Sequence, residues 1–195
     1  MNSDHAATPA PDLALVFTSL AVTLLSRHDG ETAWSVAGVA DIGADDFPDQ
    51  IGALRDAAAA LAGAPDQPPP VVLALPSDHV LRMRLPLAED PAAQADMARL
   101  AVARRIGVPA ESVLWALGPV EADGAIPMTA ILAETVEEAL AYAADWGFDP
   151  LGATGPGPDG GPLAPIITRR DAAPLAAAAA PPPADDGAQE DAAAA

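Results

Sequence analysis

The hydrophobic pattern between residues 71 and 107 predicts a strand, a second strand and a helix, and the other segments are expected to pack on this unit. Val71–Leu75 is apolar at every position, which is typical of an interior strand covered on both faces. After a turn at Pro76–Asp78, Val80–Leu87 alternates, so its apolar and arginine side chains are expected on opposite faces. Asp90–Gly107 begins with a capping aspartate and a proline and stops at glycine, which predicts a helix.

The segments before this unit predict an antiparallel meander followed by a helix. We expect strands at Leu13–Phe17, Ala21–Arg27 and Ala33–Ile42, because these runs are rich in β-branched and large apolar residues. The Asp-Gly pair at residues 29 and 30 favours a tight hairpin between the last two. Apolar residues then recur every three or four positions, which predicts a helix from Asp46 to Ala62.

The segments after it predict two strands, a helix and a short edge strand. Val113–Val120 and Ala125–Ala133 have strand composition and are separated by a turn signal. Thr135–Glu138 has the pattern of a capping box and predicts a helix that runs to Trp146. Phe148–Leu151 is expected to form a last edge strand.

Together these elements predict an α/β fold with a mixed sheet, an antiparallel meander and about three helices. We expect a single layered sheet within one domain over residues 12–155. Residues 1–11 and 156–195 are predicted to be disordered, because small, proline-rich and acidic segments cannot bury enough apolar area to order themselves.

Charge and composition narrow the functional classes. The chain has 28 acidic residues, nine arginines and no lysine, giving a net charge of −19, so nucleic acids and anionic lipid surfaces are repelled. It has no cysteine, which excludes disulfides and thiol chemistry. The N-terminus lacks the basic segment of a signal peptide, and the apolar run Leu13–Leu25 is shorter than the ~20 residues of a membrane span. A cytoplasmic protein is therefore expected.

Catalytic and metal-binding patterns are weak. His5, His28 and His79 show no metal-ligand spacing, and the adjacent residues Ser77-Asp78-His79 cannot point at one another as a catalytic triad does. Glu137 and Glu138 suit a helix start better than an acid/base pair. We therefore expect neither a catalytic residue, nor a metal, nor a cofactor.

Five of the nine arginines fall within 24 positions, and they are the candidate partner-binding residues. One interpretation is local ion pairing with neighbours such as Glu89, Asp90 and Asp96. The other is a docking face for an acidic partner or for the acidic end of this chain. The candidate residues are Arg82, Arg84, Arg99, Arg104 and Arg105.

Several segments, in order, resemble one family. Val71–Pro76 resembles a strand that ends in Leu-Pro, Arg82–Leu87 an arginine-bearing strand before a helix, and Pro109–Val113 a Pro-x-Glu-x-Val start of the next strand. Ile131–Glu134 and Trp146–Phe148 resemble the strand before the last helix and the exit from that helix. The order of elements over residues 12–155 is similar to the first half of the actin-like (ribonuclease H-like) fold. The families concerned are the actin-like component of type IV pilus assembly and the cytoplasmic domain of the type II secretion L subunit.

The resemblance implies a scaffold or adaptor that contacts another protein. ATP-binding actin-like proteins carry an Asp-x-Gly turn in the first hairpin, whereas Phe17–Leu20 contains neither aspartate nor glycine. The second half of the fold, which would close a nucleotide cleft, is not found after Leu151. The alternatives are a small ligand-binding domain or enzyme whose pocket has no sequence motif, or the N-terminal piece of a longer membrane-anchored subunit.

Overall fold

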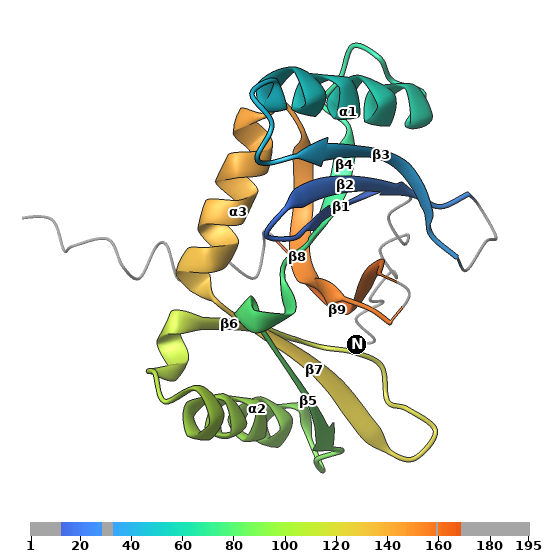
Figure 1. Ribbon diagram of the computed structural model, residues 1–195. Coiled ribbons are helices and arrows are strands. Elements are labelled where there is room, and N and C mark those ends of the chain that lie inside the picture. The colour runs from blue at the N-terminus through green and yellow to red at the C-terminus, as the bar shows by residue number, and fades with distance from the viewer. Residues whose placement is uncertain (1–12, 29–32, 159, 169–195) are drawn as a thin grey trace, which may run out of the picture.

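The computed structural model describes residues 13–28, 33–158 and 160–168, and these ranges contain three α-helices and two β-sheets (Figure 1). The elements in chain order are β1 (Leu13–Phe17), β2 (Ala21–Ser26), β3 (Ser35–Asp41), α1 (Phe47–Leu61), β4 (Pro70–Ala74), the 3-10 turn η1 (Ser77–His79), β5 (Val80–Pro86), α2 (Pro91–Ile106), the 3-10 turn η2 (Ala110–Ser112), β6 (Val113–Leu117), β7 (Ala125–Leu132), α3 (Ala133–Asp145), β8 (Asp149–Pro156) and β9 (Pro162–Thr168). The predicted α/β class with three helices is confirmed, but the expected single sheet is wrong because the strands form two.

The larger sheet has six strands in the order β3-β2-β1-β4-β8-β9. The first three strands form the predicted antiparallel meander. β4 lies parallel to β1 on one side and parallel to β8 on the other, and β9 is antiparallel to β8. The apolar side chains of β4, Val71 to Ala74, are each at most 1% exposed, so this strand is covered on both faces as its sequence predicts.

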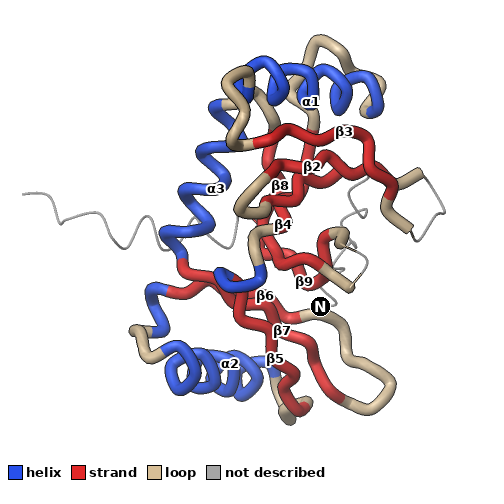
Figure 2. The backbone as a smooth tube through the Cα atoms, in the orientation of Figure 1, coloured by secondary structure: helices blue, strands red, loops and turns tan. Residues whose placement is uncertain are grey.

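Helices α1 and α3 pack on this sheet and share its main core (Figure 2). The apolar stripe predicted for α1 is confirmed, since Ile51, Leu54 and Ala58 are buried. On α3 the buried residues are Val136, Leu140 and Ala143. The two stripes join alternate residues of β1 and β4 in one cluster, so both helices lie on the same face of the sheet.

The smaller sheet contains three antiparallel strands in the order β5-β7-β6, and α2 covers one of its faces. Leu85 from β5, Met128 from β7, and Ala98 and Val102 from α2 form a second buried cluster. The alternation predicted for β5 is confirmed, because its apolar side chains face α2 while its arginines face away.

The helix ends distinguish a correct prediction from a wrong one. α2 is capped by Asp90, whose carboxylate accepts from the Ala93 amide at 2.8 Å, and it ends at Gly107 with a φ of 74°. The predicted capping box of α3 is wrong, since the helix begins two residues before Thr135, at Ala133, without a side-chain cap. Thr135 and Glu138 are therefore free to face a neighbouring hollow.

The C-terminal strands depart most from the prediction. β8 is eight residues long and lies between two other strands, so the predicted short edge strand is wrong. β9 lies inside the segment predicted to be disordered from residue 156, and that prediction is wrong for residues 162–168. Ile167 of β9 is fully buried in the main core, which stabilises a strand in an otherwise glycine- and proline-rich region. Residues 1–11 and 169–195, also predicted to be disordered, lie outside the described residues.

We predict that β9 contributes measurably to stability. Ile167→Ala should lower the free energy of unfolding by about 2–4 kcal/mol, because it removes a fully buried side chain from the core. Leu163→Ala is the matched control on the same strand, and it should cost less than about 1 kcal/mol because Leu163 is 39% exposed. Chemical denaturation of the two variants measures the difference, and equal effects would contradict the packing of β9.

Candidate functional site

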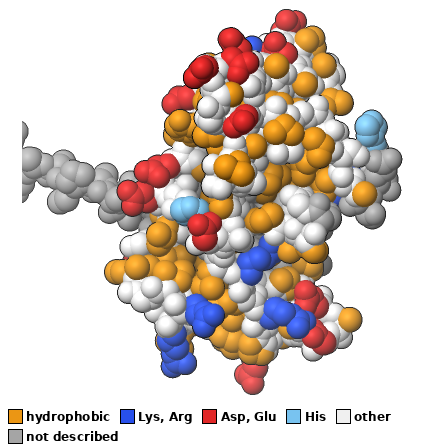
Figure 3. Space-filling view, viewed as in Figure 1, with side chains coloured by type: hydrophobic (Ala, Val, Ile, Leu, Met, Phe, Trp, Pro, Cys, Tyr) orange, Lys and Arg blue, Asp and Glu red, His pale blue; other side chains and the backbone are white. Residues whose placement is uncertain are grey.

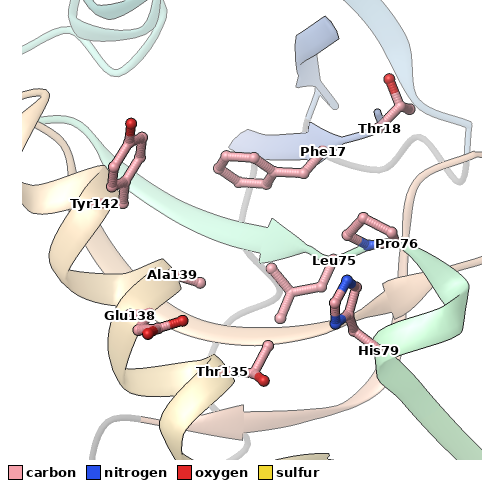
Figure 4. A pocket seen from close by; sticks show the side chains of 9 residues that line it. All are labelled: Phe17, Thr18, Leu75, Pro76, His79, Thr135, Glu138, Ala139 and Tyr142. Atoms are coloured by element: carbon pink, nitrogen blue, oxygen red, sulfur yellow. The ribbon is translucent and has the colours of Figure 1, made fainter. Parts of the chain in front are cut away.

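A hollow of about 350 Å³ opens where β1 and β4 end beside the first turns of α3 (Figure 4). Because β1 and β4 are parallel, their carboxyl ends meet at the same edge of the sheet. The hollow is lined by Phe17, Thr18, Leu75, Pro76, His79, Thr135, Glu138, Ala139 and Tyr142. Apolar and aromatic side chains form most of its wall, and a carboxylate, an imidazole and three hydroxyls join them from η1, α3 and the β1–β2 turn.

An aromatic cluster supports one wall of the hollow. The ring of Trp146 stacks on Phe17 with centroids 6.2 Å apart, and it meets Phe47 and Tyr142 edge to face at 5.6 and 4.6 Å. Such contacts fix the rings relative to one another. Tyr142 is nevertheless 59% exposed, so this aromatic surface is available to a ligand.

The turn between β1 and β2 bonds to its own backbone amides. The Thr18 hydroxyl accepts hydrogen bonds from the amides of Leu20 and Ala21 at 3.3 and 3.0 Å, and it donates to the Ala21 carbonyl at 3.0 Å. A phosphate cradle needs several backbone amides that are free to point at the anion. The β1–β2 turn therefore does not present these two amides to a phosphate.

The histidines of the described residues belong to different elements and do not form a metal site. Ser77, Asp78 and His79 form the single turn η1, and His28 lies beyond the end of β2. His5 lies outside the described residues. Within the described ranges, no three histidine or carboxylate side chains come together as a metal site.

The five candidate arginines do not form one face. Arg82 and Arg84 project from β5 on the side away from α2, whereas Arg99, Arg104 and Arg105 lie on α2 itself. The small sheet therefore separates two groups that are close in sequence. The arginines of β5 contact β9 and the loop between β6 and β7, whereas the arginines of α2 are exposed on the helix surface.

Arg82 joins the two sheets. Its guanidinium donates to the carbonyls of Ala164 and Leu163 on β9 at 2.8 and 3.3 Å, and burial lowers its pKa. The Nη1 atom of Arg82 is buried without a partner among the described residues, as is the hydroxyl of Thr129, the residue paired with Arg82 across the sheet. Arg82 thus contributes a structural contact with β9, although its charge has no carboxylate partner among the described residues.

Arg84 forms an exposed ion-pair network with the loop between β6 and β7. It donates to Glu121 through Nε at 2.9 Å and through Nη2, and to Asp123 through Nη2 at 2.6 Å. The hydrogen bonds to Asp123 and Glu121 raise the pKa of Arg84, and the hydrogen bond from Arg84 lowers the pKa of Asp123. The interpretation of local ion pairing applies to this arginine, although its partners are not those expected from the sequence.

The arginines of α2 are exposed. Arg99 pairs with Asp96 one turn earlier at 3.1 Å, which is one of the predicted local pairs. Arg104 and Arg105 occupy the last turn of α2, where positive charge suits the helix dipole. Leu100, which is 51% exposed, lies between these charges on the helix surface.

Sequence reasoning missed the hollow and the contact of Arg82 with β9. The hollow combines residues from three segments that are distant along the chain, so no local motif marks it. The wrong capping-box assignment also hid the fact that Thr135 and Glu138 face the hollow. A signal for the Arg82 contact did exist, since an arginine on a strand inside a packed protein needs acceptors.

The strand order of the large sheet, with its meander, its parallel β4 and β8 and its crossing helices, is that of one half of an actin-like fold. No protein-family model matches the sequence, and no curated protein matches it. Solved structures do match. The fold class inferred from the sequence motifs is thereby confirmed.

Two of these structures are components of bacterial assembly systems. The first is the cytoplasmic domain of EpsL, an inner-membrane component of the type II secretion system of Vibrio cholerae. It has a TM-score of 0.51 and 13% identity, over 73% of this chain and 56% of that one. The second is the PilM–PilN type IV pilus biogenesis complex, with a TM-score of 0.51 and 16% identity, over 76% of this chain and 48% of that one. The chain thus spans about half the length of each structure.

We predict that the Thr18 hydroxyl stabilises the β1–β2 turn. Thr18→Ala should lower the free energy of unfolding by about 1 kcal/mol, because the amides of Leu20 and Ala21 lose their acceptor while the Ala21 carbonyl keeps the Thr18 amide as a donor. Ser19→Ala in the same turn is the control and should change stability by less than about 0.5 kcal/mol. Urea unfolding measures both, and a neutral Thr18→Ala would contradict the role of the hydroxyl.

The Arg84 network predicts a change in the titration of Asp123. A carboxyl whose pKa is lowered by folding adds stability above its unfolded pKa of about 3.9, and this stability is lost as the pH falls through the lowered value. Arg84→Gln should move the pKa of Asp123 upward towards its ordinary value, as measured by NMR titration of the side chain. Arg99→Gln, which removes a different ion pair, should leave it unchanged. A titration of Asp123 that is the same in both variants would exclude the network.

Proposed function

We propose that this protein is a non-catalytic scaffold or adaptor that binds another protein, in a secretion or pilus assembly of the bacterial envelope. The setting is supported by the fold, which it shares with assembly components of both kinds. One of these is described as a cytoplasmic domain, and we propose the cytoplasm for this chain too. No helix in the described ranges is long and apolar enough to cross a membrane.

The observation that carries the non-catalytic assignment is the β1–β2 turn. Thr18 of this turn lines the hollow, and its hydroxyl already binds the amides of Leu20 and Ala21, whereas an actin-like nucleotide site would need free amides that point outward. The hollow beside it is mainly apolar. Such a surface suits contact with a protein side chain better than with a triphosphate.

We propose α2 as the contact surface for an acidic segment. Residues 80–132 carry five arginines and six acidic residues, so nearly all of the net charge of −19 lies elsewhere in the chain. In Figure 3 the arginines gather over the part of the molecule that contains α2 and β5, while acidic side chains dominate around α1. Arg99, Arg104 and Arg105, with Leu100 among them, combine charge with apolar area. The rest of the molecule repels nucleic acids, so the partner is a protein.

A second candidate function is the binding of a small ligand in the hollow. The observation that favours it is the exposed ring of Tyr142 on one side of a hollow that Glu138 and His79 also line, which offers stacking and polar contacts together (Figure 4). A ligand of this site would be an aromatic or cationic molecule and not a phosphate. Its binding would raise the melting temperature in proportion to its concentration.

The α2 surface predicts a charge-dependent interaction. The double variant Arg104→Glu with Arg105→Glu should weaken binding of a synthetic peptide with the sequence of residues 183–191 by at least about tenfold, because attraction becomes repulsion. Fluorescence anisotropy at low and physiological salt measures it. Arg55→Glu, an exposed arginine on α1 already paired with Asp56, is the matched control and should bind like the natural chain.

A second experiment separates this chain's own acidic end from a foreign partner. If residues 171–195 occupy α2, their removal should tighten binding of the peptide, because an internal competitor is lost. Unchanged affinity after the removal assigns α2 to another protein. Equal binding by the double variant and the natural chain would contradict the α2 surface altogether.

The non-catalytic assignment predicts no ATP turnover. Purified protein with ATP and Mg²⁺ should release phosphate no faster than the buffer alone, since the turn amides are already bonded. Turnover at about 1 s⁻¹ or above, the range of ordinary enzymes, would contradict it.

A further inference from the structure

The outer strand β3 leaves one side of its backbone unpaired. It is the end strand of the six-stranded sheet, and among the described strands it pairs with β2 alone. The Asp41 amide bonds to Gln50 Oε1 at 2.8 Å, so it points away from β2, and by alternation the Val39 amide points the same way. An unpaired edge of this kind is a template for another strand.

A bulge places two valines of β3 on the same exposed face. Val36 pairs with Leu25 and Gly38 pairs with Leu24, so the register shifts by one residue at Ala37. Gly38 faces α1, since a Cβ there would lie 2.5 Å from Leu54 Cδ2, and the neighbouring Val39 therefore faces away from α1. Val36 lies on the same face as Val39, because its partner Leu25 points to the opposite face of the sheet from Leu24. Val36 is 66% exposed and Val39 is 55% exposed.

The C-terminal end of β3 is acidic. Asp41, Asp45, Asp46 and Asp49 are all exposed, and none of them takes part in an ion pair between the described residues. The edge itself contains no lysine, arginine or proline, which are the residues that commonly prevent strands from adding to an edge. The strand thus combines an open backbone, exposed valines and a cluster of uncompensated carboxylates.

We infer that β3 binds an extended segment of another protein, which adds to the sheet as a seventh strand. The segment carries apolar residues at alternate positions to cover Val36 and Val39, and lysine or arginine at the end beside Asp41. A second copy of this chain is the wrong occupant, because two molecules with a net charge of −19 repel each other. This inference rests on the proposed adaptor function and names a contact separate from α2.

The test uses the full chain and a short synthetic peptide of alternating valine and threonine with two lysines at one end. Val39→Pro removes the outward amide without touching the pairing with β2, so it should weaken peptide binding by at least about tenfold while the melting temperature stays close to that of the natural chain. Val39→Lys should weaken binding similarly without any change of backbone. Val39→Thr, which keeps the amide and a β-branched side chain, is the matched control and should bind normally.

A second pair of peptides tests whether binding at β3 needs positive charge beside the aspartates. A peptide with glutamates in place of the lysines should bind at least about tenfold more weakly to the natural chain, and Asp45→Asn with Asp49→Asn should reduce that difference. Equal binding by Val39→Pro and the natural chain, or no binding of the lysine peptide, would overturn the inference. A dimer in sedimentation that Val39→Pro dissociates would also overturn it by assigning the edge to a second copy. Each of these results leaves the acidic-peptide test of α2 unaffected, so a failure at β3 is distinct from a failure of the adaptor proposal.

Discussion

The burial of β4 on both faces is the constraint on which the rest of the structure depends. A strand that is buried on both faces needs a hydrogen-bonded neighbour along each edge, because its backbone groups cannot bond to water. It also needs packed residues on each face to keep its apolar side chains out of water. Its two neighbours, β1 and β8, are parallel to it, and parallel strands need long crossover connections. The β4-to-β8 crossover contains the whole small sheet together with α2 and α3. The small sheet is therefore part of the connection between two parallel strands of the large sheet.

The sequence predicts the parts of this arrangement that depend on local pattern. The continuous apolar run of β4, the stripe of α1, and the aspartate and glycine that bound α2 each act over a few residues, and each was confirmed. The division into two sheets depends instead on which strands pair, and composition does not determine this. β5, for example, pairs with β7, from Pro86 with Ala125 to Val80 with Ile131. β9 escaped prediction because its neighbours are glycine and proline, while its stability comes from Ile167 and from contacts with distant strands.

In the candidate site, too, some features follow from local sequence and others only from the three-dimensional arrangement. The absence of aspartate and glycine in the first turn could be read from four letters, and the structure adds the reason why the turn still closes, which is the Thr18 hydroxyl. The arginines looked like one set because they are close in sequence. Side-chain alternation on β5 and the position of α2 divide them, and hydrogen bonds to carbonyls of β9 give Arg82 a role in joining the two sheets.

The division of charge between the layers gives the two proposed contacts different partners. The small sheet and α2 are nearly neutral and carry exposed arginines on α2, whereas Asp41, Asp45, Asp46 and Asp49 beside the open edge of β3 form no ion pair among the described residues. A segment attracted to one of these surfaces is repelled by the other, so electrostatics alone keeps an acidic partner at α2 and a basic one at β3. A protein whose two ends select opposite charges can hold two different partners at the same time, which is the physical requirement of an adaptor.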